Sequence, residues 1–208
     1  IGPSPDNVLP ARSRDWQRSL GRLLVVDDRI PYPDLGAGYP RAAAMLQTLA
    51  AAGYSVTFYP LCGGPEAWAA VRTLLAPEIE ALIDHGPDQL ADFFRERRGY
   101  YDVMLVSRPH NMRTVCSALD AVPDFIARDN IVYDAEAIFA TREALKAAVL
   151  GTGRPQTTPE TSFEHELKLA NRAARIVAVS DGEARQFKSG GIREVTVIGH
   201  ALEPRPGP

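Results

Sequence analysis

The chain has 208 residues, of which 45% are hydrophobic and 24% charged, and its formal net charge is −3. These proportions are typical of a globular protein, and the mild negative charge does not favour a nucleic-acid partner, which would select a basic face. No run approaches the ~20 apolar residues that cross a bilayer. Cys62 and Cys116 provide neither a disulfide framework nor the spacing of a zinc site, so we expect reduced thiols in a cytoplasmic protein.

Composition divides the chain into three parts. Residues 1–21 are rich in proline and polar residues, and we expect a loosely ordered leader there. Residues 22–199 alternate between strand-like and helix-like segments and predict one folded domain. Residues 200–208 are proline-rich and continue neither a strand nor a helix. We therefore expect a truncated interdomain linker at 200–208, and a chain that is one domain of a longer protein.

The most informative stretch is 22–59, which predicts a strand, a loop, a helix and a second strand. Residues 23–26 form a continuous apolar run, as expected of a strand buried on both faces of a parallel sheet. Pro40 suits the first turn of a helix, and Gly53 suits a left-handed helix end. The glycine-bearing loop before this helix is a candidate site for phosphate or another anion, because free N–H groups point out of a helix start.

The rest of the chain repeats this alternation. Strands are expected at 22–27, 55–59, 79–83, 102–107, 131–134, 175–179 and 195–198. Helices are expected at 40–52, 66–75, 87–98, 112–119, 135–150, 159–174 and 181–188. This order predicts an α/β fold with a doubly wound, mostly parallel, Rossmann-like sheet. Ligands of such sheets bind outside the carboxyl ends of the strands.

The glycine loop is not a complete dinucleotide motif. Gly36, Ala37 and Gly38 match the start of G-x-G-x-x-G, but Arg41 occupies the position of the third glycine. The loop over 28–39 is also longer than the tight turn of a dinucleotide-binding fold. NAD or FAD binding is therefore disfavoured, and the two glycines serve either backbone geometry or a close approach to a sugar or diphosphate.

An acidic pair, Asp27 and Asp28, ends the first strand, as is typical of phospho-receiver domains. The later strand that would supply a receiver's aspartate ends in Ser107 instead. Capping and solvation of the strand end is the simpler interpretation of the acidic pair.

Two further polar groups follow buried strands, and we expect both at the edge of the sheet that carries the glycine loop. Arg108, His110 and Asn111 follow one strand, and Asp134 and Glu136 follow the next. His110 is the central candidate because imidazole donates, accepts or changes protonation near neutral pH. A purely structural histidine remains an open alternative. No G-x-S-x-G, Walker A or H-E-x-x-H motif completes a catalytic constellation.

Four segments of the chain together resemble the N-terminal domain of a family 4, GT-B type glycosyltransferase. Residues 35–60 (LGAGYPRAAAMLQTLAAAGYSVTFYP) are similar to the family's glycine loop, first helix and second strand. The others are 101–111 (YDVMLVSRPHN), 174–187 (ARIVAVSDGEARQF) and 195–204 (VTVIGHALEP). The chain departs from the family at Gly199 and His200, which replace the usual Asn-Gly, and it lacks the family's C-terminal domain with its E-x7-E pair.

The resemblance implies an acceptor-side half of a retaining enzyme that moves a sugar from a nucleoside-diphosphate sugar to an acceptor hydroxyl. The complete protein would be the enzyme, and this half alone would be inactive. The resemblance implies no metal and no cofactor. The implied partners are the nucleotide-sugar, a glycan, lipid-linked or small-molecule acceptor, and the chain's own C-terminal domain. It is also compatible with a cytoplasmic protein that touches the inner membrane face.

The candidate site combines residues of these segments with polar residues that follow the ends of the first and fifth predicted strands. The candidate acid–base residues are His110 and Asp134. The candidates for substrate binding are Gly36, Ala37, Gly38, Tyr39, Arg41, Arg29, Arg108, Asn111, Glu136 and Ser180. The alternatives are a stand-alone α/β binding module and a receiver-like signalling domain.

Overall fold

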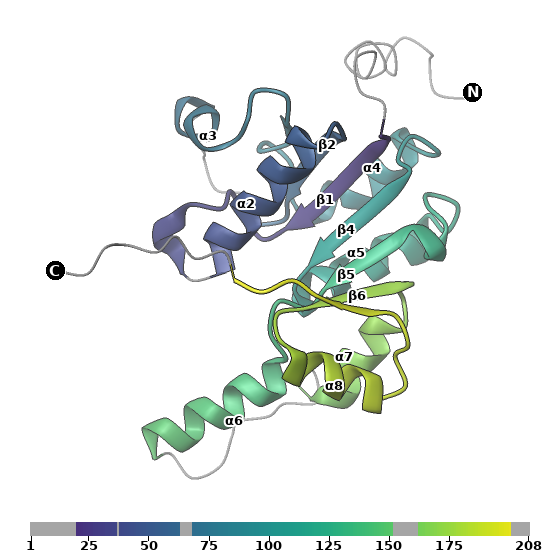
Figure 1. Cartoon of the computed structure of the whole chain (residues 1–208). Coiled ribbons are helices and arrows are strands. Elements are labelled where there is room, and N and C mark those ends of the chain that lie inside the picture. Colours follow the sequence, from purple (N-terminus) through teal and green to yellow (C-terminus); the bar gives the residue numbers. More distant parts are fainter. Residues whose placement is uncertain (1–19, 37, 63–67, 152–161, 201–208) are drawn as a thin grey trace, which may run out of the picture.

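The computed structural model describes residues 20–36, 38–62, 68–151 and 162–200. These residues form one open, seven-stranded sheet in the order β3-β2-β1-β4-β5-β6-β7. Every neighbouring pair of strands is parallel. Helices cover both faces of the sheet (Figure 1). The predicted doubly wound, Rossmann-like α/β fold is confirmed.

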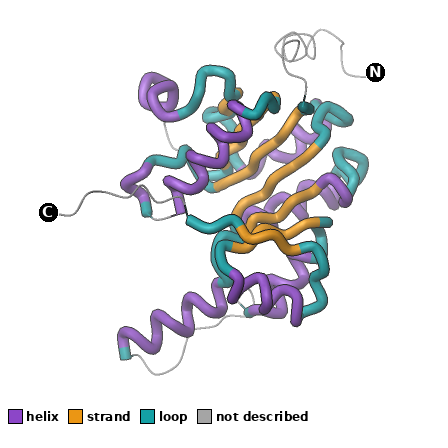
Figure 2. Tube along the Cα trace, in the orientation of Figure 1, coloured by secondary structure: helices purple, strands orange, loops and turns teal. Residues whose placement is uncertain are grey.

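The elements alternate along the chain, as the trace in Figure 2 shows. The strands are β1 (Arg22–Asp27), β2 (Ser55–Pro60), β3 (Glu80–Ala81), β4 (Val103–Ser107), β5 (Ile131–Asp134), β6 (Arg175–Ala178) and β7 (Val195–Val197). The α-helices are α2 (Gly38–Ala51), α3 (Trp68–Leu74), α4 (Leu90–Glu96), α5 (Pro109–Ala121), α6 (Phe139–Leu150), α7 (Phe163–Ala170) and α8 (Asp181–Ser189). Short 3-10 turns are η3 (Pro33–Leu35), η4 (Pro87–Gln89) and η5 (Arg128–Asn130). Each predicted strand is present, although β3 is shorter than expected.

The order of the strands reverses between β1 and β4. The chain builds β1, β2 and β3 outward in one direction, and then β4 to β7 outward in the other. Loops that leave β1 and β4 therefore diverge, and the crevice between them is where doubly wound sheets bind ligands. Asp28 and Arg108 are the first residues after these two strands.

Two hydrophobic cores lie on the two faces of this single sheet. Leu23 and Val25 of β1 belong to the core that includes residues of α2 and α3. Leu24 and Val26 belong to the core that includes residues of α4, α5, α7 and α8. Successive side chains of a strand point to opposite faces. The unbroken apolar run of β1 is thus explained by burial on both sides.

The α2 face of the sheet is only partly covered by the described residues. A cavity of about 470 Å³ lies over it, lined by apolar strand residues and bounded by α2 and by residues 198–200 after β7. The strand residues that line it are Leu23, Val103, Leu105, Val132 and Val177. Parallel sheets ordinarily bury both faces, so this apolar surface is unusual for the fold.

Of the seven predicted helix starts, only that of α8 at Asp181 matches the structure, and the differences at α2, α5 and α6 have clear local causes. α2 begins at Gly38, and Pro40 fits because the first turn needs no N–H from it. α5 begins at Pro109, another proline in a first turn. α6 begins at Phe139 rather than at residue 135, because Glu136 has a φ of 57°, outside the right-handed helical region. Most of the expected leader and linker, and Ala37, lie outside the described residues.

Buried acids support the start of α6. Glu166 of α7 accepts a hydrogen bond from the N–H of Ala140 at 3.2 Å. Glu183 of α8 accepts one from the N–H of Ile138 at 3.0 Å. Glu166 has no exposed surface, and burial raises the pKa of this carboxyl from 4.5 to about 7. Near pH 6, Glu166 is therefore mostly protonated in the folded chain and mostly ionised in the unfolded chain.

We expect the free energy of unfolding to decrease as the pH rises from about 5 to about 7, because the native state binds more protons than the unfolded state in this range. Asp27, whose pKa burial also raises to about 7, acts in the same direction. Glu166→Gln keeps the acceptor oxygen and should make this decrease smaller. Chemical denaturation at several pH values measures the difference, with the exposed Glu164→Gln of the same helix as control. Equal slopes in the wild type and Glu166→Gln would show that Glu166 does not contribute.

Candidate functional site

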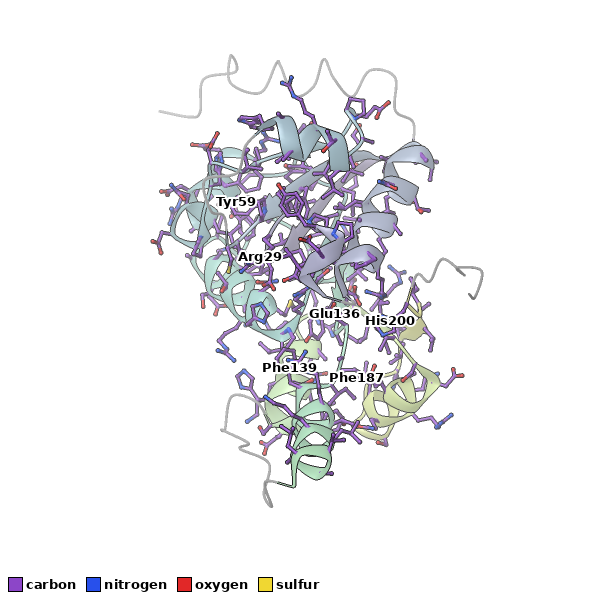
Figure 3. The ribbon with its side chains drawn as sticks, turned by 90° about the vertical axis from the view of Figure 1, so that its left-hand side faces the viewer. Arg29, Tyr59, Glu136, Phe139, Phe187 and His200 are labelled. Carbon is purple, nitrogen blue, oxygen red and sulfur yellow. The ribbon has the colours of Figure 1, made fainter. Side chains whose placement is uncertain are left out.

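Charged side chains gather at the carboxyl ends of the neighbouring strands β1 and β4. They come from the ends of β1, β4 and β5, from the start of α5 and from α2. We call Asp27, Asp28, Arg41, Arg108, His110, Asp134 and Glu136 the edge cluster. Figure 3 places Glu136 near the middle of the molecule, close to Phe139 at the start of α6. The structure therefore brings both candidate acid–base residues, His110 and Asp134, to one edge of the sheet.

Arg108 is the centre of the edge cluster. Its Nη1 lies 2.6 Å from Oδ2 of Asp28. Its Nε lies 3.1 Å from Oδ1 of Asp27 and 2.9 Å from Oε2 of Glu136. The guanidinium also stacks on the ring of Tyr39, 4.4 Å from its centroid. One buried cation thus contacts three carboxyl groups.

The surroundings of the two adjacent aspartates shift their pKa values in opposite directions. Burial raises the pKa of Asp27 to about 7, although the charge of Arg108 opposes the shift. Burial would also raise the pKa of Asp28, but the hydrogen bond and charge of His110, with the charge of Arg108, lower it below its ordinary value. Asp28 is therefore the carboxylate that stays ionised at neutral pH.

His110 lies in the first turn of α5 and contacts Asp28. Its Nε2 is hydrogen-bonded to Oδ1 of Asp28, while 44% of its side chain is exposed. Phe139 packs edge-on to the imidazole, with 6.4 Å between the ring centroids. Asp28 orients the ring and leaves it accessible from solvent. An imidazole held in this way can exchange a proton with a bound hydroxyl group.

A second ion pair joins α2 to β5. Arg41 donates from Nη1 to Oδ2 of Asp134 at 2.5 Å and from Nη2 to Oδ1 at 3.0 Å. The two side chains are only 3% and 1% exposed. Arg41 also donates from Nε to the carbonyl of Ile198 at 3.1 Å. Asp134 therefore contacts Arg41, and the carboxylate that contacts His110 is Asp28.

Gly36, before α2, and Gly38, its first residue, serve different geometric needs. Gly36 has a φ of 140°, a conformation that residues with a Cβ rarely adopt. At Gly38 a Cβ would overlap Oε1 of Glu136 and lie 3.5 Å from Nη2 of Arg108, so a side chain there would have to displace the carboxylate. The loop predicted to approach a ligand thus approaches Glu136 in this structure.

The remaining candidate residues have varied surroundings. Arg29 is exposed at the end of β1 and is labelled in Figure 3. Asn111 is buried, and its amide donates to the carbonyl of Ser107 at 2.9 Å. Ser180 accepts a hydrogen bond from the N–H of Glu183 at 3.2 Å, which makes it the N-cap of α8.

Asp27 and Asp28 were not among the residues expected in the site, and solvation was the favoured interpretation. The structure buries both, at 2% and 8% exposure. A signal was present in the sequence, since an acidic pair ends one buried strand and Arg108 with His110 follow the next strand of the sheet core. Opposite charges at one sheet edge predict ion pairs.

The described residues were also considered as metal ligands and as membrane-spanning helices. Within the described ranges, no group of three or more His, Cys, Asp or Glu residues could hold a metal ion. None of the described helices is both long and apolar enough to span a membrane.

The fold and the edge cluster define a doubly wound parallel α/β domain with a group of charged side chains at its switch point. Among solved structures, the chain is similar to sucrose-phosphate synthase from Thermosynechococcus elongatus, with a TM-score of 0.56 and 11% sequence identity. The similarity covers 86% of this chain and 47% of the synthase, so the chain spans about half of that protein's length. At this identity the likeness shows the fold alone. No protein-family model and no curated protein sequence matches the chain.

Proposed function

We propose that the chain is the acceptor-side half of a retaining GT-B glycosyltransferase, which transfers a sugar from a nucleoside-diphosphate sugar to an acceptor hydroxyl. The observation that carries the proposal is the exposed imidazole of His110, held by Asp28 at the switch point. The fold shared with an enzyme named for making sucrose phosphate supports it.

In the proposed reaction, His110 binds the acceptor hydroxyl. Its Nε2 is engaged by Asp28, so Nδ1 is the nitrogen available to the acceptor. The acceptor oxygen forms a bond to the anomeric carbon of the sugar as the bond to the diphosphate oxygen breaks. The leaving diphosphate keeps the bonding electron pair, and the hydroxyl proton passes to Nδ1. Because Asp28 is ionised, it stabilises the imidazolium that results.

The start of α2 would stabilise the leaving diphosphate. Helix N-termini present N–H groups that favour an anion, and this effect is strongest where charge develops in the transition state. Gly36 and Gly38 let the backbone of this loop approach a ligand closely. Arg29 is exposed and can supply charge-assisted hydrogen bonds.

Arg41 and Asp134 have a positioning role in this proposal. Their ion pair links α2 to the end of β5, and the contact of Arg41 with Ile198 adds the segment after β7. These contacts fix the start of α2 relative to the edge cluster. We propose that both residues act through this arrangement and not by touching the sugar.

A stand-alone α/β binding module is the alternative, and affinity distinguishes it from half of an enzyme. The isolated chain should bind nucleoside-diphosphate sugars weakly, because a cleft with one wall leaves much of the ligand in water, whereas tight small-ligand sites bury ~70–90% of it. Calorimetry with a panel of these compounds tests this expectation. Micromolar binding by the chain alone would place the whole site in this half and favour the binding module.

A further inference from the structure

Glu136 lies at the position where an anion would meet the start of α2. Its Oε1 occupies the space that a Cβ on Gly38 would need. Its Oε2 lies 2.9 Å from Nε of Arg108, and 18% of its side chain is exposed. A carboxylate of this chain therefore stands between the first residue of α2 and the central guanidinium of the edge cluster.

Arg108 is directed at the same position, where its Nη2 donates a long hydrogen bond to Oε1 of Glu136 at 3.4 Å. The residue is 9% exposed, and its Nη2 would lie 3.5 Å from a Cβ on Gly38. Its Nε is buried and makes no hydrogen bond, although two carboxylates lie close to it. The neighbouring carboxylates compensate its charge without aligning with this N–H. A phosphoryl group can accept two parallel hydrogen bonds from a guanidinium, whereas Glu136 accepts only the long one from Nη2.

The two residues of the Glu136–Arg108 contact have unfavourable backbone conformations. Both residues have positive φ angles, 57° and 73°, and no other non-glycine residue of the described segments does. Such backbone conformations are unfavourable for residues with a Cβ. Burial also raises the pKa of Glu136, although the charge of Arg108 opposes the shift. The carboxylate is therefore a poorer occupant of this position than an ion that carries more charge.

We propose that Glu136 is an internal substitute for the diphosphate of the sugar donor, and that the donor displaces it on binding. This inference rests on the proposed function. In the empty cleft, Glu136 compensates Arg108 and occupies the start of α2. When the diphosphate enters, Glu136 turns away and Arg108 exchanges a carboxylate for phosphoryl oxygens. Glu136 is then a positioning residue that lowers the affinity of the open cleft for anions.

Binding of inorganic pyrophosphate to the chain tests the substitution. Glu136→Gln removes the competing charge and should bind pyrophosphate at least about tenfold more tightly than the wild type. Glu136→Gly should do the same and also relieves the positive φ, so it serves if the glutamine variant folds poorly. Gly38→Ala displaces the carboxylate but fills the position with a methyl group, and should show no gain.

Glu80→Gln is the matched control. Glu80 lies on the edge strand β3 and is paired with Arg97 at 2.8 Å, with 19% of its side chain exposed. The Glu80→Gln variant loses the same kind of ion pair, but outside the edge cluster. It should leave pyrophosphate binding unchanged.

The outcomes separate this inference from the proposed function. Equal affinity in the wild type, Glu136→Gln and Glu136→Gly would overturn the substitute role, and sugar transfer by the complete enzyme would still support the proposed function. Tighter binding in both Glu136 variants, absent in Glu80→Gln, would support the substitute role. If the complete enzyme then transferred no sugar, the anion site would stand and the proposed function would be contradicted.

Discussion

Replacing Arg41 with methionine should lower the free energy of unfolding by about 3–5 kcal/mol, because it leaves Asp134 as an uncompensated buried charge. Asp134 is 1% exposed, and both of its oxygens accept hydrogen bonds from Arg41. Urea denaturation monitored by circular dichroism measures the loss.

An exposed ion pair provides the matched control for Arg41→Met. Arg172 and Asp120 lie 2.6 Å apart, with 43% and 65% of their side chains exposed. Arg172→Met should change the free energy of unfolding by at most ~1 kcal/mol. Replacing both buried partners, Arg41→Met with Asp134→Leu, should recover much of the loss. A change below ~1 kcal/mol in Arg41→Met alone would contradict a buried, mutually dependent pair.

If the proposed function is right, His110→Ala should lower kcat/KM of the complete enzyme by about 10- to 1000-fold while changing the melting temperature little. The ring exchanges a proton with the acceptor hydroxyl in the proposed reaction, and 44% of its side chain is exposed, so its packing contribution is small. Asp28→Asn should reproduce part of the loss, because it removes the charge that orients the imidazole and stabilises its protonated form.

His165→Ala on α7 serves as the control for His110→Ala, since His165 lies outside the edge cluster. It should keep near-normal specific activity. Activity and melting temperature are measured on each purified variant. A fully active, stable His110→Ala enzyme would remove His110 from the reaction, and a variant that lost only melting temperature would show that the histidine is structural.

The fold was predictable because its signals are local. The apolar run of β1 requires burial on both faces, and the same alternation of strand and helix recurs along the chain. The helix starts were less predictable. The expected helix over 135–150 ignored the positive φ of Glu136, which follows from its contacts with Arg108 and Gly38 and not from its neighbours in sequence.

The candidate site was predictable only as a set of residues at one edge. Parallel strands place the residues that follow their carboxyl ends together, so His110, Asp134 and Glu136 were expected near the glycine loop. Their pairing could not be read from the sequence, because each ion pair joins residues far apart in the chain. Asp28 rather than Asp134 contacts His110, and Asp134 is hydrogen-bonded to Arg41 of α2 instead.

Sugar transfer by the complete polypeptide tests the central claim most directly. The protein used joins this chain to the proposed sugar-donor-binding half. It is given a panel of nucleoside-diphosphate sugars together with glycan and lipid-linked acceptors. The measurement is the release of nucleoside diphosphate. We predict that at least one sugar donor is consumed, that the product keeps the anomeric configuration of the donor, and that His110→Ala slows the reaction. A folded complete protein that leaves every sugar donor intact would contradict the assignment of this chain to a glycosyltransferase.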